Sequence, residues 1–513
     1  MRQQSLEMEN TQTRLRRSWL DRVLRLLMTL SAILVLSSCG ASSPEGGGPA
    51  FPTSDGGSSH GVSPDAGNPD AGGPQAGSPD AGEPDGGVST QTIGVNGRVM
   101  DLAGQVKAGT WVAIKSGSFW ETRVVDPGGN FTVPDVPIPY DVWVIVEGTS
   151  PWDYLRSGTA TTTVEVGVTA SVGLTSPSPT VLDLTRTDPG TEHVASIRGR
   201  VSGGIGFPTP GDYGTILAFS SPTGGALGSV NTISFETGAY LTDVHWLGPP
   251  EVSGTLHALQ FQVGGQGPES YSGYGAASVQ LTAGGVSSLE VPLAPVTVAR
   301  VSGTYTSPPN YVGGWQVWMN FGADRGGLAI ASGAAGPFSA LTPNVPGATF
   351  WAFGYASQPT WDDDPASSVV IKSNLAADAT SVALTSPPAP ELNLPEPGAG
   401  NVSTGTRFSW TAPAGGVSIL HVRPPGNSGP SFYVVTSELS ASIPDLAGGG
   451  PMLPITTGYS WWVVGIGPFP GVDLAAPGIR NLLNGLDFEG GPPTSPVDGY
   501  VTNSFRRTFA TSR

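Results

Sequence analysis

The sequence predicts an all-β protein built as a string of β-sandwich domains, and three observations lead to this prediction. Gly and Pro, with 74 and 49 residues, make up about a quarter of the 513 residues, which is typical of short strands joined by many turns. Apolar and polar residues alternate in short runs that Gly and Pro interrupt, as in the antiparallel strands of a sandwich. The length exceeds the roughly 100 to 200 residues of one domain, so three or four units are expected.

Residues 1–38 are expected to be an export signal. Several arginines precede the apolar run 26–36, which is shorter than the roughly 20 residues that span a bilayer. The run ends in Leu36-Ser37-Ser38-Cys39-Gly40, which resembles the lipobox of bacterial lipoproteins, where the chain is cut before a Cys that carries diacylglycerol. Cys39 is the only cysteine, so a disulfide within the chain is excluded. We therefore expect Cys39 to be lipidated and to hold the protein at membrane lipid; the alternatives are a chance Cys after an ordinary signal and an N-terminal membrane anchor.

Two features bear on export and sorting. Arg16-Arg17-Ser18-Trp19-Leu20 resembles a twin-arginine signal, while the general secretory route is the default for an arginine-rich N-terminus. Gly40, in place of Asp, follows the acylated Cys, and by resemblance to known sorting rules this favours the outer membrane. We expect an outer-membrane lipoprotein of the cell envelope that faces either the periplasm or the cell surface.

Residues 39–90 are expected to be the lipidated Cys and a disordered linker. This segment has almost no large apolar side chains, so it cannot bury enough surface to offset the entropy of ordering. Pro recurs every five residues from Pro64 to Pro84, often as Pro-Asp-Ala-Gly. One Asp every five residues is a poor cage for calcium, which takes about six to eight oxygen ligands, so a solvated spacer is favoured.

Residues 91–190 are expected to form the first sandwich. Val95-Asn96-Gly97-Arg98-Val99 indicates an opening strand, a Gly-rich turn leads to Phe131, and Pro139-Tyr140 leads into a late strand. In this order the pieces resemble the carboxypeptidase regulatory-like, or transthyretin-like, domain family, in which the aromatic residue after the turn enters the core. The resemblance implies an Ig-like or transthyretin-like accessory β-sandwich without catalytic residues.

Residues 191–295 and 296–388 are expected to repeat this sandwich. The opening strand recurs at Ile197–Val201 and at Val301–Tyr305, and its Gly recurs with it. The aromatic residue after the turn recurs as Tyr240 and Phe338. Pro-rich joints after each copy set the boundaries.

Residues 389–513 differ from the repeats. Phe408-Ser409-Trp410 and Tyr459-Ser460-Trp461 resemble the second and sixth strands of fibronectin type III domains, where a core Trp faces a Tyr. A final strand is expected at 502–508. A short helical insertion on the sandwich rim is predicted before it by the spacing of Ile479, Leu482, Leu483 and Leu486. Ordinary core packing also explains these four residues.

The sequence indicates no enzyme and no cofactor. The five histidines, His60, His193, His245, His257 and His421, are scattered without a metal-ligand spacing. No cysteine nucleophile exists outside the lipobox, and no Gly-Xaa-Ser-Xaa-Gly elbow stands between a strand and a helix. The paired carboxylates of a glycosidase are not excluded, but nothing in the sequence nominates a pair. The net charge of -17 argues against nucleic acid as a partner.

The sharpest local feature is Trp361-Asp362-Asp363-Asp364-Pro365. Asp362, Asp363 and Asp364 are a candidate calcium site, and Trp361 beside them is a candidate ligand-binding residue. A solvated acidic loop is the favoured alternative. Trp315 and Trp318 should lie on opposite strand faces, and so should Trp461 and Trp462, which makes Trp318 a second candidate for an exposed binding surface. Packing between domains would explain these tryptophans equally well.

The sequence as a whole predicts a non-enzymatic envelope lipoprotein that presents tandem sandwiches for structural contacts or protein interactions. A surface lipoprotein that binds polysaccharide is the alternative. An envelope protein or a polysaccharide is therefore the expected partner besides membrane lipid at Cys39.

Overall fold

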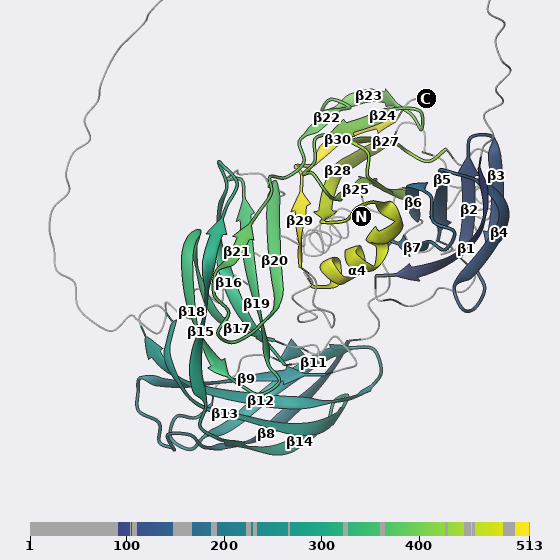
Figure 1. Cartoon of the computed structure of the whole chain (residues 1–513). Helices are drawn as coiled ribbons and strands as arrows, with labels where there is room; N and C mark the ends of the chain where they lie inside the picture. The colour runs from purple at the N-terminus through teal and green to yellow at the C-terminus, as the bar shows by residue number, and fades with distance from the viewer. Residues whose placement is uncertain are drawn as a thin grey trace, which may run out of the picture.

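The computed structural model describes residues 91–511, with gaps at 103, 105–109, 147–166, 186–191, 222–226, 229–232, 265–266, 322–326, 360–364, 426–428, 446–452, 454–456 and 486–497. The predicted signal peptide, Cys39 and the linker to residue 90 lie outside the described residues. Strands dominate and form β-sandwiches, which confirms the predicted fold class (Figure 1). No helix among the described residues is long and apolar enough to cross a membrane.

The first sandwich has two facing sheets. In one, β1 (Thr92–Asp101) is central, antiparallel to β4 (Asn130–Pro137) and parallel to β7 (Thr180–Asp183). In the other, the strand order is β3-β2-β5-β6. These strands are β2 (Trp111–Ser116), β3 (Phe119–Val124), β5 (Tyr140–Ile145) and β6 (Gly167–Leu174). Alternate side chains of both sheets, such as Val99 and Val112, fill a common core.

The second sandwich has the same plan, because its first strand β8 is antiparallel to β11 and parallel to β14. The facing sheet has the order β13-β12-β9, and the short strand β10 joins the sheet of β8 at its edge. The bounds are β8 (Glu192–Gly203), β9 (Tyr213–Ser220), β10 (Leu227–Gly228), β11 (Ala239–Leu247), β12 (Glu251–Gly264), β13 (Gly267–Thr282) and β14 (Val286–Leu293).

The third sandwich repeats the plan again, with β15 antiparallel to β18 and parallel to β21. Its other sheet has the order β17-β16-β19-β20. The bounds are β15 (Thr297–Thr306), β16 (Val312–Asn320), β17 (Gly327–Ala334), β18 (Gly336–Asn344), β19 (Thr349–Ser357), β20 (Ser367–Leu375) and β21 (Val382–Thr385).

One local device recurs in the three opening strands. A Gly in the strand lies directly opposite a buried aromatic residue that follows a turn Gly with positive φ by two positions. The pairs are Gly97 with Phe131, Gly199 with Tyr240 and Gly303 with Phe338. A Cβ at Gly97 would lie 2.1 Å from the Phe131 ring, so only Gly lets the aromatic ring cover the backbone.

The fourth sandwich packs β22-β24-β27 against the sheet of β28, β25 and β26. Its strands are β22 (Leu392–Leu394), β23 (Ala399–Val402), β24 (Arg407–Trp410), β25 (Val417–Arg423), β26 (Ser431–Thr436), β27 (Ser440–Ser442), β28 (Gly458–Gly467), β29 (Gly499–Asn503) and β30 (Arg507–Thr511). The prediction of one final strand at 502–508 is wrong. The chain leaves the strand at Ser504, whose hydroxyl accepts a hydrogen bond from the Val463 amide, and resumes as β30.

The third, fourth and first sandwiches share one 14-stranded sheet. Strand β20 of the third pairs with β29 of the fourth, and β26 of the fourth pairs in parallel with β6 of the first. Residues far apart in the sequence therefore lie side by side, and in Figure 1 the fourth sandwich lies between the other two. The second sandwich packs against the third, since Leu259 and Tyr271 share a core with Val301 and Val317.

A helical segment fills the junction of the first and fourth sandwiches. It comprises the short η1 (Val472–Leu474) and α4 (Ala475–Gly485), and it buries Ile479 and Leu482 in a core to which the first and fourth sandwiches both contribute. Asp473 accepts hydrogen bonds from the Thr175 amide and hydroxyl and from the Ser176 amide after β6. The predicted helix is present, but it lies at this junction and not on an outer rim.

The Gly–aromatic pair gives a stability prediction within one strand. The Gly97→Ala substitution forces its Cβ into the Phe131 ring and should lower the free energy of unfolding by about 1–3 kcal/mol. The Gly94→Ala substitution, in the same strand, meets nothing within 4 Å and should be neutral or nearly so. Chemical denaturation of both full-length variants, followed by tryptophan fluorescence, compares them. Equal losses at the two positions would contradict this account.

Candidate functional site

The predicted site residues fall into two groups. Cys39, Trp361 and Asp362, Asp363 and Asp364 lie outside the described residues. Trp318 is described: it is half-buried on β16, packs against the core of the first sandwich and its neighbours, and donates its indole N–H to Gln316 Oε1 at 2.9 Å. The structure therefore gives Trp318 packing and hydrogen-bond partners within the fold.

Trp315 and Trp318 do lie on opposite faces of β16, but both faces are covered. Trp315 belongs to the core that the second and third sandwiches share, while Trp318 packs against the core on the other side. Trp461 is fully buried, and Trp462 stacks on His421 at 4.8 Å with the Arg506 guanidinium 4.6 Å from its ring. These tryptophans form no exposed row, because Trp315, Trp318 and Trp461 pack in or against buried cores, while His421 and Arg506 lie against Trp462.

Trp120 on β3 is the tryptophan most open to solvent among the described residues, with 41% of its surface exposed. It packs edge-on against the buried Trp143 with ring centroids 5.1 Å apart. The Lys115 ammonium lies 5.3 Å from the centre of the Trp143 ring, and Asp141 is paired with Lys115 across the strands. Burial raises the pKa of Asp141, while the amide of Gly173 and the charge of Lys115 oppose this shift.

One buried polar cluster brings a hydroxyl and an imidazole together. In the second sandwich His257 Nε2 lies 2.8 Å from Ser220 Oγ, and His257 Nδ1 lies 2.7 Å from the Tyr274 hydroxyl. The imidazole also stacks on Phe321 of the third sandwich, with ring centroids 3.6 Å apart. Sequence reasoning missed this cluster because the pairing of β9 with β12, which places Ser220 beside His257, leaves no local signature.

The arrangement of Ser220 and His257 is unsuited to nucleophilic catalysis. Ser220 is fully buried and His257 is 7% exposed, so a substrate cannot reach the hydroxyl in this conformation. Burial lowers the pKa of His257 to about 3, and an imidazole with so low a pKa is a poor general base near neutral pH. We interpret the cluster as a polar joint between the second and third sandwiches.

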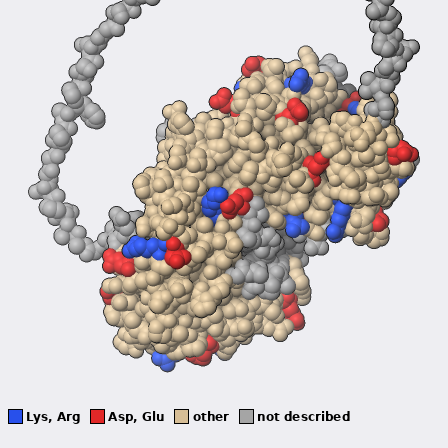
Figure 2. Space-filling view, in the orientation of Figure 1, with Lys and Arg blue, Asp and Glu red and all other residues tan. Residues whose placement is uncertain are grey.

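The described residues form few other features that could support chemistry. The best-formed hollow among the described residues is shallow, about 440 Å³, and is lined by Arg198, Arg200, Tyr240 and Glu290 with three neighbours. No group of three metal-ligating side chains occurs in the described part of the chain. On the face drawn in Figure 2, the few Lys, Arg, Asp and Glu residues are scattered among uncharged ones.

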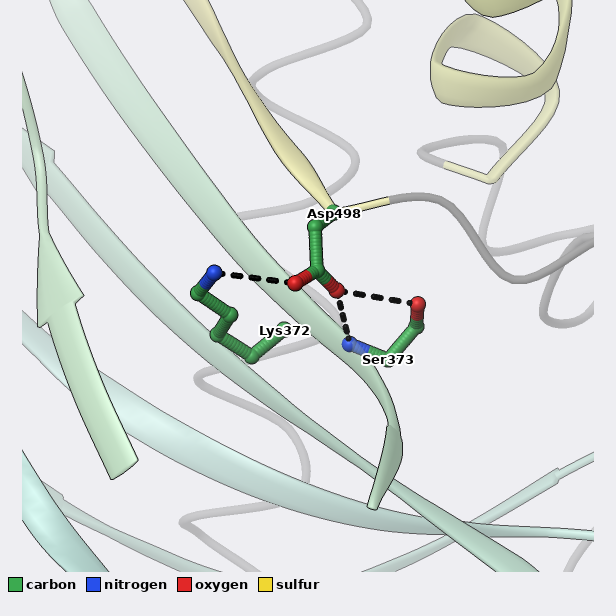
Figure 3. A network of polar contacts seen from close by, with 3 residues as sticks. All are labelled: Lys372, Ser373 and Asp498. Carbon is green, nitrogen blue, oxygen red and sulfur yellow. Dashed lines mark hydrogen bonds and ion pairs between the residues drawn. The ribbon is translucent and has the colours of Figure 1, made fainter. Parts of the chain in front are cut away.

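The join of the third and fourth sandwiches carries a polar network (Figure 3). Asp498, just before β29, accepts hydrogen bonds from Lys372 Nζ at 2.9 Å and from the Ser373 amide at 2.9 Å on β20. Burial raises the pKa of Asp498, but the bonds and charge of Lys372 and the Ser373 amide lower it by more, so the pKa lies below its usual value. The side chains of Lys372 and Asp498 are 40% and 49% exposed, so their ion pair contributes at most about 1 kcal/mol. Strand pairing and core packing therefore hold the two sandwiches together.

The sequence matches no protein-family model and no curated protein. Among solved structures it is similar to the Bacillus anthracis TIE protein (8% identity, 57% of this chain and 50% of that chain, TM-score 0.13). The pilus adhesin SpaC from Lactobacillus rhamnosus GG has 10% identity over 58% of this chain and 44% of that chain (TM-score 0.13). A Ca²⁺-stabilized adhesin with which an Antarctic bacterium binds ice has 12% identity over 82% of this chain and 99% of that chain (TM-score 0.12). The chain thus spans about half the length of the first two.

His257 makes stability depend on pH. Its pKa is about 3 in the folded protein and about 6.5 in an unfolded chain, so only the unfolded state binds a proton between these values. The stability contribution is complete above pH 6.5 and should fall by up to about 1.4 kcal/mol per pH unit as pH decreases toward 3.

Urea denaturation between pH 6.5 and 5.0, where most carboxylates stay ionised, measures this slope. The His257→Gln variant should lose part of it. The remainder should come from His421, whose pKa burial and the charges of Arg423 and Arg506 also lower to about 3. The variant with both His257→Gln and His421→Gln is the control, and its free energy of unfolding should change least with pH. If the pH slope of the His257→Gln variant equals that of the unmodified chain, His257 is not involved.

Proposed function

We propose that the chain is a lipid-anchored, non-enzymatic protein of the bacterial cell envelope that holds its sandwiches in a fixed arrangement for structural contacts or protein interactions. The observation that carries this proposal is the 14-stranded sheet. Main-chain pairing at β20–β29 and β26–β6 makes the third, fourth and first sandwiches one continuous body. In a flexible string of modules, linkers would separate the sandwiches at these places. A fixed spatial arrangement of surfaces suits a scaffold or a binding protein, and the Ser220–His257 geometry does not suit catalysis.

The position of this body at a membrane is part of the proposal. The Leu36-Ser37-Ser38-Cys39-Gly40 sequence supports acylation at Cys39, because small residues precede a solitary cysteine after an apolar run. Two or three acyl chains would hold the chain firmly, at about 0.8 kcal/mol per buried CH₂. A flexible linker of the length of 39–90 spans on the order of 40 Å, which would separate the sandwiches from the lipid surface. The outer membrane is the location we propose.

The assignment of domain types is also a proposal. In the first three sandwiches the opening strand has the same two neighbours, one antiparallel and one parallel, which supports three copies of one transthyretin-like unit at 91–190, 191–295 and 296–388. In the fourth, Trp410 and Tyr459 share one core, which supports a fibronectin type III-like unit at 389–513.

Anchoring by Cys39 can be tested with one substitution. The full chain should be labelled by radioactive palmitate and partition into the detergent phase of Triton X-114, while Cys39→Ser should lose the label and move to the aqueous phase with an unchanged circular dichroism spectrum. The matched control, Cys39→Ser with Ser43→Cys, keeps a thiol near the same place but outside the lipobox, and it should behave like Cys39→Ser. Unchanged membrane partitioning of Cys39→Ser would refute the anchor.

Polysaccharide binding is the second candidate, and the exposed Trp120 beside Lys115 and Asp141 favours it, because sugar rings stack on aromatic faces and bond to charged groups. Trp361 with Asp362–Asp364 is the other proposed ligand site. A glycan array should then detect binding by the full chain that Trp120→Ala or Trp361→Ala reduces at least tenfold. An array without any signal from the full chain excludes the glycans tested.

A further inference from the structure

The free edges of the described sheets are protected in different ways, with one exception. Edge strands β4, β13, β14 and β18 carry prolines, which cannot donate to a further strand. Edge strands β7, β10, β21, β22, β23 and β27 are no longer than four residues. Strands β9 and β17 lie against each other at the contact of the second and third sandwiches. Among the described strands this leaves β3, the terminal strand of the 14-stranded sheet.

Strand β3 has the chemistry of a pairing edge. It has six residues without Pro, Gly or Lys, and its outer edge pairs with no described strand. One face carries Trp120, Thr122 and Val124, with 41% of Trp120 and 52% of Val124 exposed. The other face carries Glu121 and Arg123, which form an ion pair with each other. A partly apolar edge without a pairing partner is a template for another strand.

The order of these residues is complementary to itself. If two copies of β3 pair antiparallel about a twofold axis at Thr122, Glu121 of each copy lies opposite Arg123 of the other. On the opposite face, Trp120 of each copy lies opposite Val124 of the other, and the two threonines face each other. Opposite charges and aromatic–β-branched pairs are favourable across strands, whereas a shift of the axis to residue 121 or 123 would bring like charges together.

We propose that β3 is a homodimerisation edge through which two copies of this chain join their sheets across a twofold axis at Thr122. The sheet already grows in this way inside one chain, where β20–β29 and β26–β6 join separate sandwiches by strand pairing. A twofold contact of one edge with itself closes after two copies, so it gives a dimer and no fibre. The inference concerns a partner of the folded chain and does not depend on acylation of Cys39.

Disulfide trapping tests the position of the axis. The full-length chain with Cys39→Ser has no other thiol, so an added cysteine is the only one. Thr122→Cys places two sulfurs face to face, at a Cα separation of about 4.5–5.5 Å that a disulfide accepts. Val124→Cys, on the same face, is the matched control, because two such residues lie about 13 Å apart along the paired strands. Mild oxidation should convert Thr122→Cys to dimer at least ten times faster than Val124→Cys.

Charge reversal tests the pairing independently. In sedimentation equilibrium the Cys39→Ser chain should form a dimer. Arg123→Glu places like charges opposite each other twice and should weaken the dimer by about tenfold or more, while Glu121→Arg with Arg123→Glu should restore it. The proposal is overturned if the chain is monomeric at 100 µM, on the order of a weak dimer's dissociation constant. It is also overturned if Thr122→Cys and Val124→Cys cross-link at the same rate, or if the variant with both charges reversed dimerises as weakly as Arg123→Glu alone. If the chain is always monomeric and Trp120→Ala abolishes its glycan binding, β3 is a sugar-binding edge and not a dimerisation edge.

Discussion

Parallel pairing of β6 with β26 is the constraint on which most of this architecture depends. It joins residues 167–171 to residues 431–435, so the first sandwich is completed against the last one and not against its sequence neighbour. Once β6 is placed there, both of its faces are covered: Val168 and Ala170 enter the core of the fourth sandwich, while Leu174 enters the core of the first. The helix α4 then has a defined position, because Asp473 binds the turn that follows β6. Local propensity cannot supply this order, since an isolated parallel edge is weak until cores cover both of its faces.

The same constraint explains why aromatic residues and titratable groups are used internally. A sandwich that stood alone would expose the outer face of each sheet, and residues such as Trp143, Trp318 and Trp351 would lie on such faces. Here the neighbouring sandwich covers them, and Trp143 and Trp351 are at most 3% exposed. At the contact of the second and third sandwiches, His257 likewise forms hydrogen bonds with its two hydroxyl partners. A buried polar group without a partner would cost about 1–3 kcal/mol. The interior is therefore used for cohesion between sandwiches.

How much of this follows from the sequence differs from element to element. The strand-rich class follows from alternation and turn residues, which are local. The resemblance to the transthyretin-like family, carried by short local motifs, implied that the aromatic residue after the turn, Phe131 and its counterparts Tyr240 and Phe338, enters the core. The helix was visible in the spacing of Ile479 and Leu482, but its place between two sandwiches was not, because its partners lie some 300 residues earlier in the chain. The joins β6–β26 and β20–β29 were invisible for the same reason: Val-rich strands pair with many others equally well, and only the assembled cores select the partner. Without these joins, Trp318 reads as a surface residue.

The order of sandwiches in space also has a consequence for folding. Because the first sandwich pairs with the fourth, its β6 edge has no partner until about 260 further residues have emerged. Contacts of such separation form slowly, since loop closure must precede any gain from them. During that time the edges present a risk of wrong pairing, and this favours the proline-bearing, short or mutually covered edges found on the other sheets. The small number of charges, 12% of residues, means that charge repulsion supplies little of this protection, so backbone chemistry supplies it. Strand β3 lacks each of these protections, and an edge left open among so many closed ones is most simply explained by a partner strand of its own.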